Sequence, residues 1–190
     1  MKWFTLKRYC KETAMPPSYP LRPIVNTALF VALISIGAFI AVPIGPVPIV
    51  LQNMFVLLAG LILGPAWGLA CVGVYLLTGL AGLPVFAGGT SGIGKLFGPT
   101  GGYLLGYLPA VLVTGVLSRA LGKRLGGDIL AAVAGSVVVY TAGVPWLKIA
   151  FSLSWGKAVA AGMVPFLLGD AVKIAAAAVI AGKIRPLVKL

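Results

Sequence analysis

Apolar runs alternate with short clusters of glycine, proline and basic residues along most of this 190-residue chain. A helix rises about 1.5 Å per residue, so runs of roughly 20 apolar residues are typical of helices that cross a bilayer core of roughly 30 Å. The pattern predicts six transmembrane helices, over residues 24–42, 50–64, 66–83, 103–120, 128–147 and 164–182. We therefore expect an all-α fold: a polytopic integral membrane protein whose six-helix bundle lies within residues 24–190.

Two charged residues interrupt the last apolar run. Asp170 and Lys173 are three residues apart, so their side chains share one face of a helix. An ionised group inside a bilayer normally faces protein, water or a ligand, because contact with lipid is unfavourable. One interpretation is that the pair binds a ligand, and the other is that the two charges neutralise each other and tie the helix into the bundle. We favour the first, because neutral packing residues join helices at lower cost.

Polar and small residues mark the first two runs. The amides Gln52 and Asn53 lie near the start of the second run, and they either line a polar cavity at the outer face or lie in the membrane interface. In the first run, Ala28 and Ala32 are four residues apart, a spacing of small residues that lets another helix approach closely. That second helix belongs either to the same bundle or to another protein.

A glycine-rich segment, PVFAGGTSGIGKLFGPTGG, breaks the apolar pattern at residues 84–102. Its glycines disfavour a helix and leave backbone amides free to approach a ligand or to fold back as a lid. The candidate ligand contacts in this loop are Gly88, Gly89, Thr90, Ser91 and Lys95. The stretch from Gly89 to Lys95 matches the first seven positions of a nucleotide-binding P-loop. Leu96 stands where that motif has Ser or Thr for magnesium, so we do not predict nucleotide binding.

The composition narrows the class of protein further. Hydrophobic residues make up 60% of the chain and the mean hydropathy is +1.08, more than a soluble domain needs. The net charge of +12 comes from basic residues that flank apolar runs, so the membrane explains it and we expect no nucleic-acid partner. The chain has no His, and Cys10 and Cys71 lack metal-ligand spacing. We therefore predict no catalytic residue, no metal site and no enzymatic activity.

The distribution of basic residues predicts the orientation of the chain. With the amino terminus inside, three bases face outward, Lys173 lies within the membrane, and the other eleven face the cytoplasm. Those eleven are Lys2, Lys7, Arg8, Lys11, Arg22, Arg119, Lys123, Arg124, Lys183, Arg185 and Lys189. The positive-inside rule then places both termini in the cytoplasm and the glycine-rich loop, between the third and fourth helices, outside. Residues 1–23 are expected to form a basic, proline-rich cytoplasmic tail that rests on anionic lipid headgroups.

Five separated motifs give the chain a resemblance to a known family. They are PIGPVPIVLQ at 43–52, LLAGLILGP at 57–65, GLAGLPVFAGG at 79–89, GPTGGYLLGY at 98–107 and GDAVKI at 169–174. In this order, over about residues 24–183, the sequence resembles the BioY family, the biotin-specific S components of energy-coupling-factor transporters. The resemblance implies a six-helix protein of a bacterial or archaeal cell membrane that binds biotin from outside.

The resemblance also implies roles for particular residues and partners. Asp170 and Lys173 match the family's D-x-x-K biotin-binding pair, and the loop at 84–102 supplies part of the pocket. Ala28 and Ala32 match the A-x-x-x-A face that contacts a transmembrane coupling subunit. Uptake requires that subunit and two ATPase subunits, so ATP is used by the partners and the chain itself needs no cofactor.

The chemistry of biotin agrees with the candidate residues. Its ureido ring has two N–H donors and a carbonyl acceptor, its body is apolar, and it ends in a carboxylate. Asp170 can accept from the ureido N–H groups, and Lys173 can donate to the ureido oxygen or pair with the carboxylate. Lys95 is the second candidate for the carboxylate, and Tyr140 is one of several aromatics that pack either against the apolar body or in the core. The alternatives are an S component for another vitamin and a proton-coupled secondary carrier that uses Asp170.

Overall fold

The computed structural model describes residues 21–42 and 46–188, and helices dominate it. They are α2 (Leu21–Phe39), α3 (Gln52–Leu80), α4 (Gly94–Phe97), α5 (Gly101–Ala120), α6 (Leu125–Ala150), α7 (Trp155–Gly162), the 3₁₀ helix η1 (Val164–Phe166) and α8 (Leu167–Ile184). Two short strands, β1 (Ala41–Val42) and β2 (Ile49–Val50), pair antiparallel. Five helical stretches of the described chain are long and apolar enough to cross a membrane, and one of them, α3, contains two predicted segments. The predicted all-α membrane fold is confirmed.

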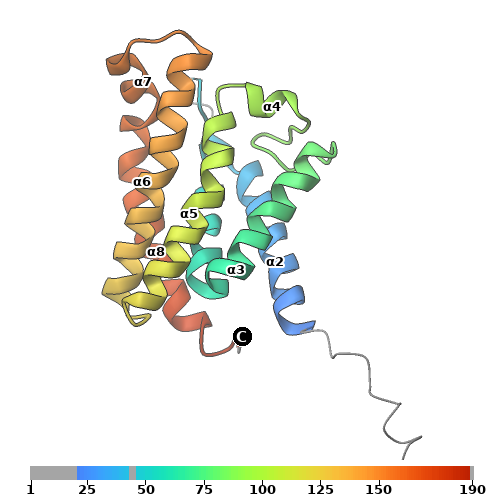
Figure 1. Cartoon of the computed structure of the whole chain (residues 1–190), viewed down its shortest axis with the longest axis vertical. Helices are drawn as coiled ribbons and strands as arrows, with labels where there is room; N and C mark the ends of the chain where they lie inside the picture. Colours follow the sequence, from blue (N-terminus) through green and yellow to red (C-terminus); the bar gives the residue numbers. More distant parts are fainter. Residues whose placement is uncertain (1–20, 43–45, 189–190) are drawn as a thin grey trace, which may run out of the picture.

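A sharp bend divides α3 into two halves. Gly64 has φ 76° and ψ −174°, a conformation that glycine adopts far more readily than other residues, and Pro65 follows it. Gln52 in the first half donates a hydrogen bond of 2.9 Å to the hydroxyl of Tyr75 in the second half. The two halves therefore run back along each other, and the bend lies at the end of the bundle opposite α4 (Figure 1). The break predicted between the second and third segments occurs at the expected position.

Close helix contacts build the bundle around α5. This helix packs against α6 and α3, while α8 packs against α3 and α6, and α2 packs against α3 at the edge of the bundle (Figure 1). Small residues allow the close approach of α5 and α6: a Cβ atom placed on Gly106 would lie 3.0 Å from the Cβ of Ala142. A larger residue at this position would push the two helices apart.

A partly buried ion pair fixes the end of α8 at the end of the bundle opposite α4. Asp128, near the start of α6, is fully buried, and both of its carboxylate oxygens accept hydrogen bonds of 3.0 Å from Arg185 Nη2. Ser118 Oγ of α5 donates a further hydrogen bond of 2.5 Å to the same carboxylate. Since Arg185 directly follows α8, the network joins that helix to α5 and α6. Sequence reasoning does not predict this network.

The observed bounds correct several predicted ones. The first helix begins at Leu21, inside the predicted tail of residues 1–23, and it ends at Phe39 because the backbone at 41–42 pairs with β2 instead. The rest of that tail, residues 1–20, lies outside the described residues. The fifth helix extends beyond the predicted 128–147 at both ends, and the segment at 164–182 begins as η1 before it becomes α8.

The glycine-rich segment and its surroundings contain more helix than predicted. Within 84–102, α4 forms a single turn and α5 already begins at Gly101, and the rest of the segment is loop, as its glycines predict. A single turn needs few intrahelical hydrogen bonds, and the backbone N–H of Gly98 donates to the carbonyl of Lys95. The short helix α7 is also unpredicted, although the Ser154 hydroxyl accepts a hydrogen bond from the N–H of Lys157 at its start, as a helix N-cap does.

Candidate ligand-binding site

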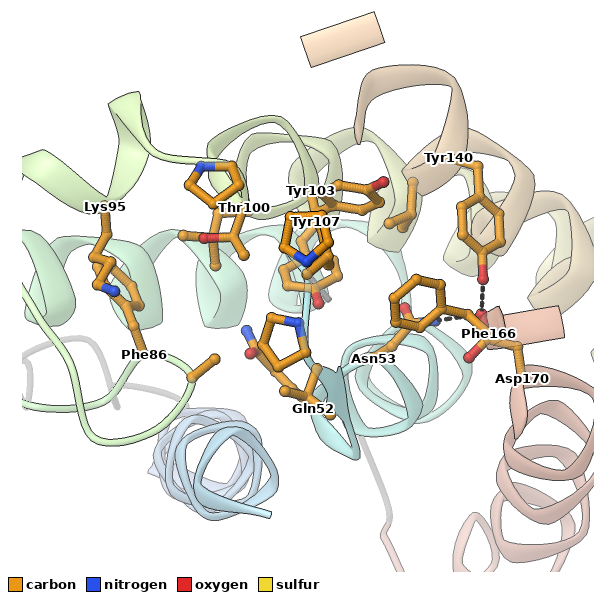
Figure 2. Close-up of a pocket in the computed structure, with 18 of the residues that line it drawn as sticks. Gln52, Asn53, Phe86, Lys95, Thr100, Tyr103, Tyr107, Tyr140, Phe166 and Asp170 are labelled. Carbon is orange, nitrogen blue, oxygen red and sulfur yellow. Dashed lines mark hydrogen bonds between the residues drawn. The ribbon is translucent and has the colours of Figure 1, made fainter. Parts of the chain in front are cut away.

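A cavity of about 160 Å³ lies at the end of the bundle that carries α4 (Figure 2). Its walls come from residues 46–50, the start of α3, the loop before α4, α4 itself, the link from α4 to α5, α5, α6, η1 and α8. Seven residues named from the sequence line it: Gln52, Asn53, Thr90, Lys95, Tyr140, Asp170 and Lys173. In Figure 2, Lys95 lies on one side and Asp170 on the other, with Tyr103 and Tyr107 between them. The cavity is therefore polar at both of these sides and aromatic in its middle.

Asp170 lies in a hydrogen-bond network that joins three helices. Its Oδ1 accepts from Lys173 Nζ at 3.1 Å. Its Oδ2 accepts from Asn53 Nδ2 of α3 at 3.5 Å, from Ser136 Oγ of α6 at 3.5 Å, and from the Tyr140 hydroxyl of α6. The side chain is only 7% exposed. Three of these donors share Oδ2 and one binds Oδ1, so Oδ1 keeps a lone-pair position for a further donor, and the four bonds offset the cost of burying the charge.

Asp170 and Lys173 contact each other, and both side chains also line the cavity. The Lys173 side chain is 11% exposed, and one of the three hydrogens of its ammonium group points to Asp170. The other two hydrogens are available to an acceptor in the cavity. The prediction that the two residues share a helix face is confirmed, and the two interpretations of the pair, neutralisation and ligand binding, are compatible in this geometry.

The two amides of α3 line the cavity rather than the membrane interface. Gln52 is 1% exposed, and its bond to Tyr75 continues to the loop, because the Tyr75 hydroxyl donates to the carbonyl of Val85 at 3.1 Å. Asn53 is 8% exposed, and its Oδ1 has no hydrogen-bond partner among the described residues. A buried acceptor without a donor is unfavourable, so a ligand N–H group would be accommodated well near Asn53.

The glycine-rich loop contributes Thr90 and Lys95 to the cavity wall. Gly88, Gly89 and Ser91 are not among the described residues that line it. Gly88 and Gly89 have φ of 70° and 72° and form the turn between Phe86 and Thr90, which make an antiparallel bridge. Backbone conformation therefore explains the two glycines, and their contact with a ligand stays a prediction.

Comparison with models of protein families matches residues 11–190 to the BioY family. The chain belongs to the BioY family. The match covers all the described residues and begins closer to the amino terminus than the resemblance over 24–183 suggested.

Individual relatives agree with this assignment. The "Probable biotin transporter BioY" of Pyrococcus horikoshii is 42% identical over 158 residues, which cover 83% of this chain and 93% of that protein. The "Biotin transporter BioY" of Thermotoga maritima is 38% identical over 167 residues, which cover 88% of this chain and 98% of that protein. A crystal structure of the S-component for biotin from an ECF-type ABC transporter is 31% identical and superposes with a TM-score of 0.84, covering 91% of this chain and 95% of that chain. The resemblance drawn from the motifs is confirmed.

Some site residues of this BioY-family chain are missed by sequence reasoning. Tyr107 and Phe166 line the cavity, and Ser136 bonds to Asp170. One signal was available: Ser136 and Tyr140 are four residues apart on α6, as are Tyr103 and Tyr107 on α5, which places each pair on one helix face. Phe166 carries no comparable signal, because η1 follows a chain reversal after α7.

Ala28 and Ala32 lie away from the cavity, on an exposed face of α2. The same face of this BioY-family chain exposes larger apolar side chains: Val25 is 55% exposed, Leu29 57% and Ile36 56%. An apolar face of this kind suits lipid or another membrane helix.

Proposed function

We propose that this chain is the high-affinity biotin-binding membrane subunit of a biotin uptake system that is driven by an ATP-hydrolysing energy-coupling module. One observation carries the proposal: in a chain of the BioY family, Asp170 and Lys173 line the same cavity as the amides and aromatics that a small polar ligand needs. An acid and a base at membrane depth are rare and mark a functional site by default, and here both line a cavity.

The cavity offers complementary groups for each part of biotin. The ureido ring presents N–H donors and a carbonyl acceptor, which match the Asp170–Lys173 pair and the Asn53 amide oxygen. The apolar body of biotin can pack against the aromatic rings that line the cavity, such as those of Tyr107 and Phe166. A site built on buried hydrogen bonds discriminates strongly against ligands that lack the matching groups.

The proposal includes partners that hydrolyse ATP. These are a transmembrane coupling subunit and two ATPase subunits, and the chain itself acts without enzymatic activity. Support comes from the family resemblance and from the incomplete P-loop, in which Leu96 occupies the magnesium-binding position. The face of α2 around Ala28 and Ala32 is exposed, as a contact surface for the coupling subunit needs to be.

The proposed location is the cell membrane of a bacterium or archaeon, with both termini in the cytoplasm and the glycine-rich loop outside. The support is the positive-inside rule, because basic residues are concentrated on the side of the bundle where Arg119, Lys123 and Lys183 lie. The cavity is then reached from outside the cell.

Isothermal titration of the detergent-purified full-length protein with biotin tests the proposal. We expect tight, saturable binding with one site per chain. A panel of other vitamins, titrated in competition, distinguishes an S component for a different ligand, which would bind another compound more tightly than biotin. Uptake into liposomes that contain this protein alone, driven by a pH gradient, would instead show a proton-coupled carrier.

A further inference from the structure

Two lysines among the described residues line the cavity, and their electrostatic surroundings differ. Lys173 Nζ lies 3.1 Å from Asp170 Oδ1. Within residues 21–42 and 46–188 the acids are Asp128 and Asp170, and Asp128 pairs with Arg185. Lys95 therefore has no acidic partner in the described part of the chain, and its positive charge is not compensated there.

Contacts on both sides of α4 hold the backbone of Lys95 in place. Before it, the N–H of Gly92 donates to the carbonyl of Gly79 in α3 at 2.8 Å. After it, Trp146 Nε1 of α6 donates to the carbonyl of Gly98 at 2.9 Å. The backbone of Lys95 is thus held at the cavity wall before any ligand binds, which reduces the backbone entropy lost on binding.

The charges of the cavity distinguish its two sides. Figure 2 shows Lys95 on the side opposite Asp170. The Asp170–Lys173 pair has no net charge, so it offers a ligand carboxylate little net attraction, whereas the uncompensated charge of Lys95 attracts it. Lys95 is half-buried, whereas Asp170 is only 5% exposed. A ligand carboxylate beside Lys95 therefore stays closer to water and loses less of its hydration.

We infer that Lys95 binds the carboxylate of biotin, while the Asp170–Lys173 pair binds the ureido ring. This orientation rests on the proposed function, because it assumes that biotin is the ligand. It assigns the two ends of the ligand to two different lysines and makes Lys95 the residue that selects for a terminal carboxylate. Lys173, already paired with Asp170, contributes its remaining hydrogens to the neutral ureido oxygen.

The test compares biotin with biotin amide, in which a neutral amide replaces the carboxylate. Dissociation constants of both ligands are measured by titration for the full-length protein and its variants. We expect Lys95→Met to weaken biotin binding about ten- to a hundredfold, the loss of one charge-assisted hydrogen bond, and to leave the amide unaffected. Lys95→Arg should keep the preference for biotin. Lys173→Met should weaken both ligands by the same factor.

Lys157→Met is the matched control, because Lys157 is an exposed lysine of α7 that is not among the described cavity residues. It should bind both ligands as the wild type does. Equal weakening of biotin and biotin amide by Lys95→Met would overturn the inference, as would a loss of ligand preference in Lys173→Met alone. A wild-type protein that binds both ligands equally also overturns it, whereas one that binds neither overturns the proposed function itself.

Discussion

Arg185 Nη2 donates a hydrogen bond to the carbonyl oxygen of Leu61, 3.1 Å away. Leu61 lies four residues before Pro65, whose ring nitrogen has no hydrogen to donate to that carbonyl. The same guanidinium group pairs with the buried Asp128. One side chain at the end of α8 therefore supplies the hydrogen bond that the bend in α3 lacks and also compensates a buried charge.

Replacing Asp128 with Asn should destabilise the protein, because Arg185 then loses its counter-charge. Removing one partner of a fully buried ion pair typically costs about 3–5 kcal/mol, and the cost here should be lower because the Arg185 side chain is 16% exposed. We expect a lower midpoint of thermal unfolding in detergent and unchanged biotin affinity of the folded protein, since the pair lies at the end of the bundle opposite the cavity. Lys183→Met, an exposed base in the last turn of α8, is the control. An Asp128→Asn variant as stable as the wild type would contradict this role.

Replacing either member of the Asp170–Lys173 pair should weaken biotin binding. Asp170→Asn and Lys173→Ala each remove a charge from the cavity wall, and we expect about a hundredfold loss of affinity. Titration of the purified variants measures it. Val172→Ala serves as the control, because Val172 is 70% exposed on the same helix. If both charge variants kept the wild-type affinity, the pair would serve only to neutralise itself.

Tyr140 should act through Asp170. Tyr140→Phe keeps the ring but removes the hydroxyl that donates to Asp170 Oδ2, and we expect about tenfold weaker biotin binding. A double-mutant cycle with Asp170→Asn tests the connection, because residues in one hydrogen-bond network have non-additive effects. Strictly additive effects of the two substitutions would show that Tyr140 acts independently of Asp170.

Alanine substitutions at Gly64 and Gly73 should have opposite effects on stability. Gly64 has φ 76°, and an added Cβ would lie 2.8 Å from Arg119 Nε, so Gly64→Ala should destabilise by about 1–3 kcal/mol. Gly73 lies within α3 with nothing within 4 Å of an added Cβ, so Gly73→Ala should stabilise by about 0.5–1 kcal/mol. Thermal unfolding of both variants measures the difference. The bend at Gly64 would lose its explanation if both variants unfolded at the same temperature.

Ala28→Trp should separate binding from transport. The substitution adds bulk to the exposed face of α2, away from the cavity, so biotin affinity should stay unchanged. Uptake in cells that contain the energy-coupling module should stop, because the bulky side chain would block the contact proposed between this face and the coupling subunit. Leu29→Ala, which makes the same face smaller, is the comparison variant. Normal uptake by Ala28→Trp would show that this face makes no such contact.

Local features of the sequence account for the class of fold and for the chemical type of the site. Bilayer thickness determines how long an apolar run must be, so the transmembrane segments can be predicted one at a time. The break at Gly64 and Pro65 is equally local, because it depends on the conformations that two adjacent residues allow. The spacing of Asp170 and Lys173 lies within one helical turn, which is why their shared face was predictable.

Packing between distant segments determined everything else about the site. Asp170 receives its other hydrogen bonds from Asn53 of α3 and from Ser136 and Tyr140 of α6, and no local pattern pairs those residues with α8. The approach of Lys95 to the cavity likewise depends on contacts of its loop with α3 and α6. Spacing along one helix says which side chains share a face, but which faces meet is set by how closely all the helices can pack against one another.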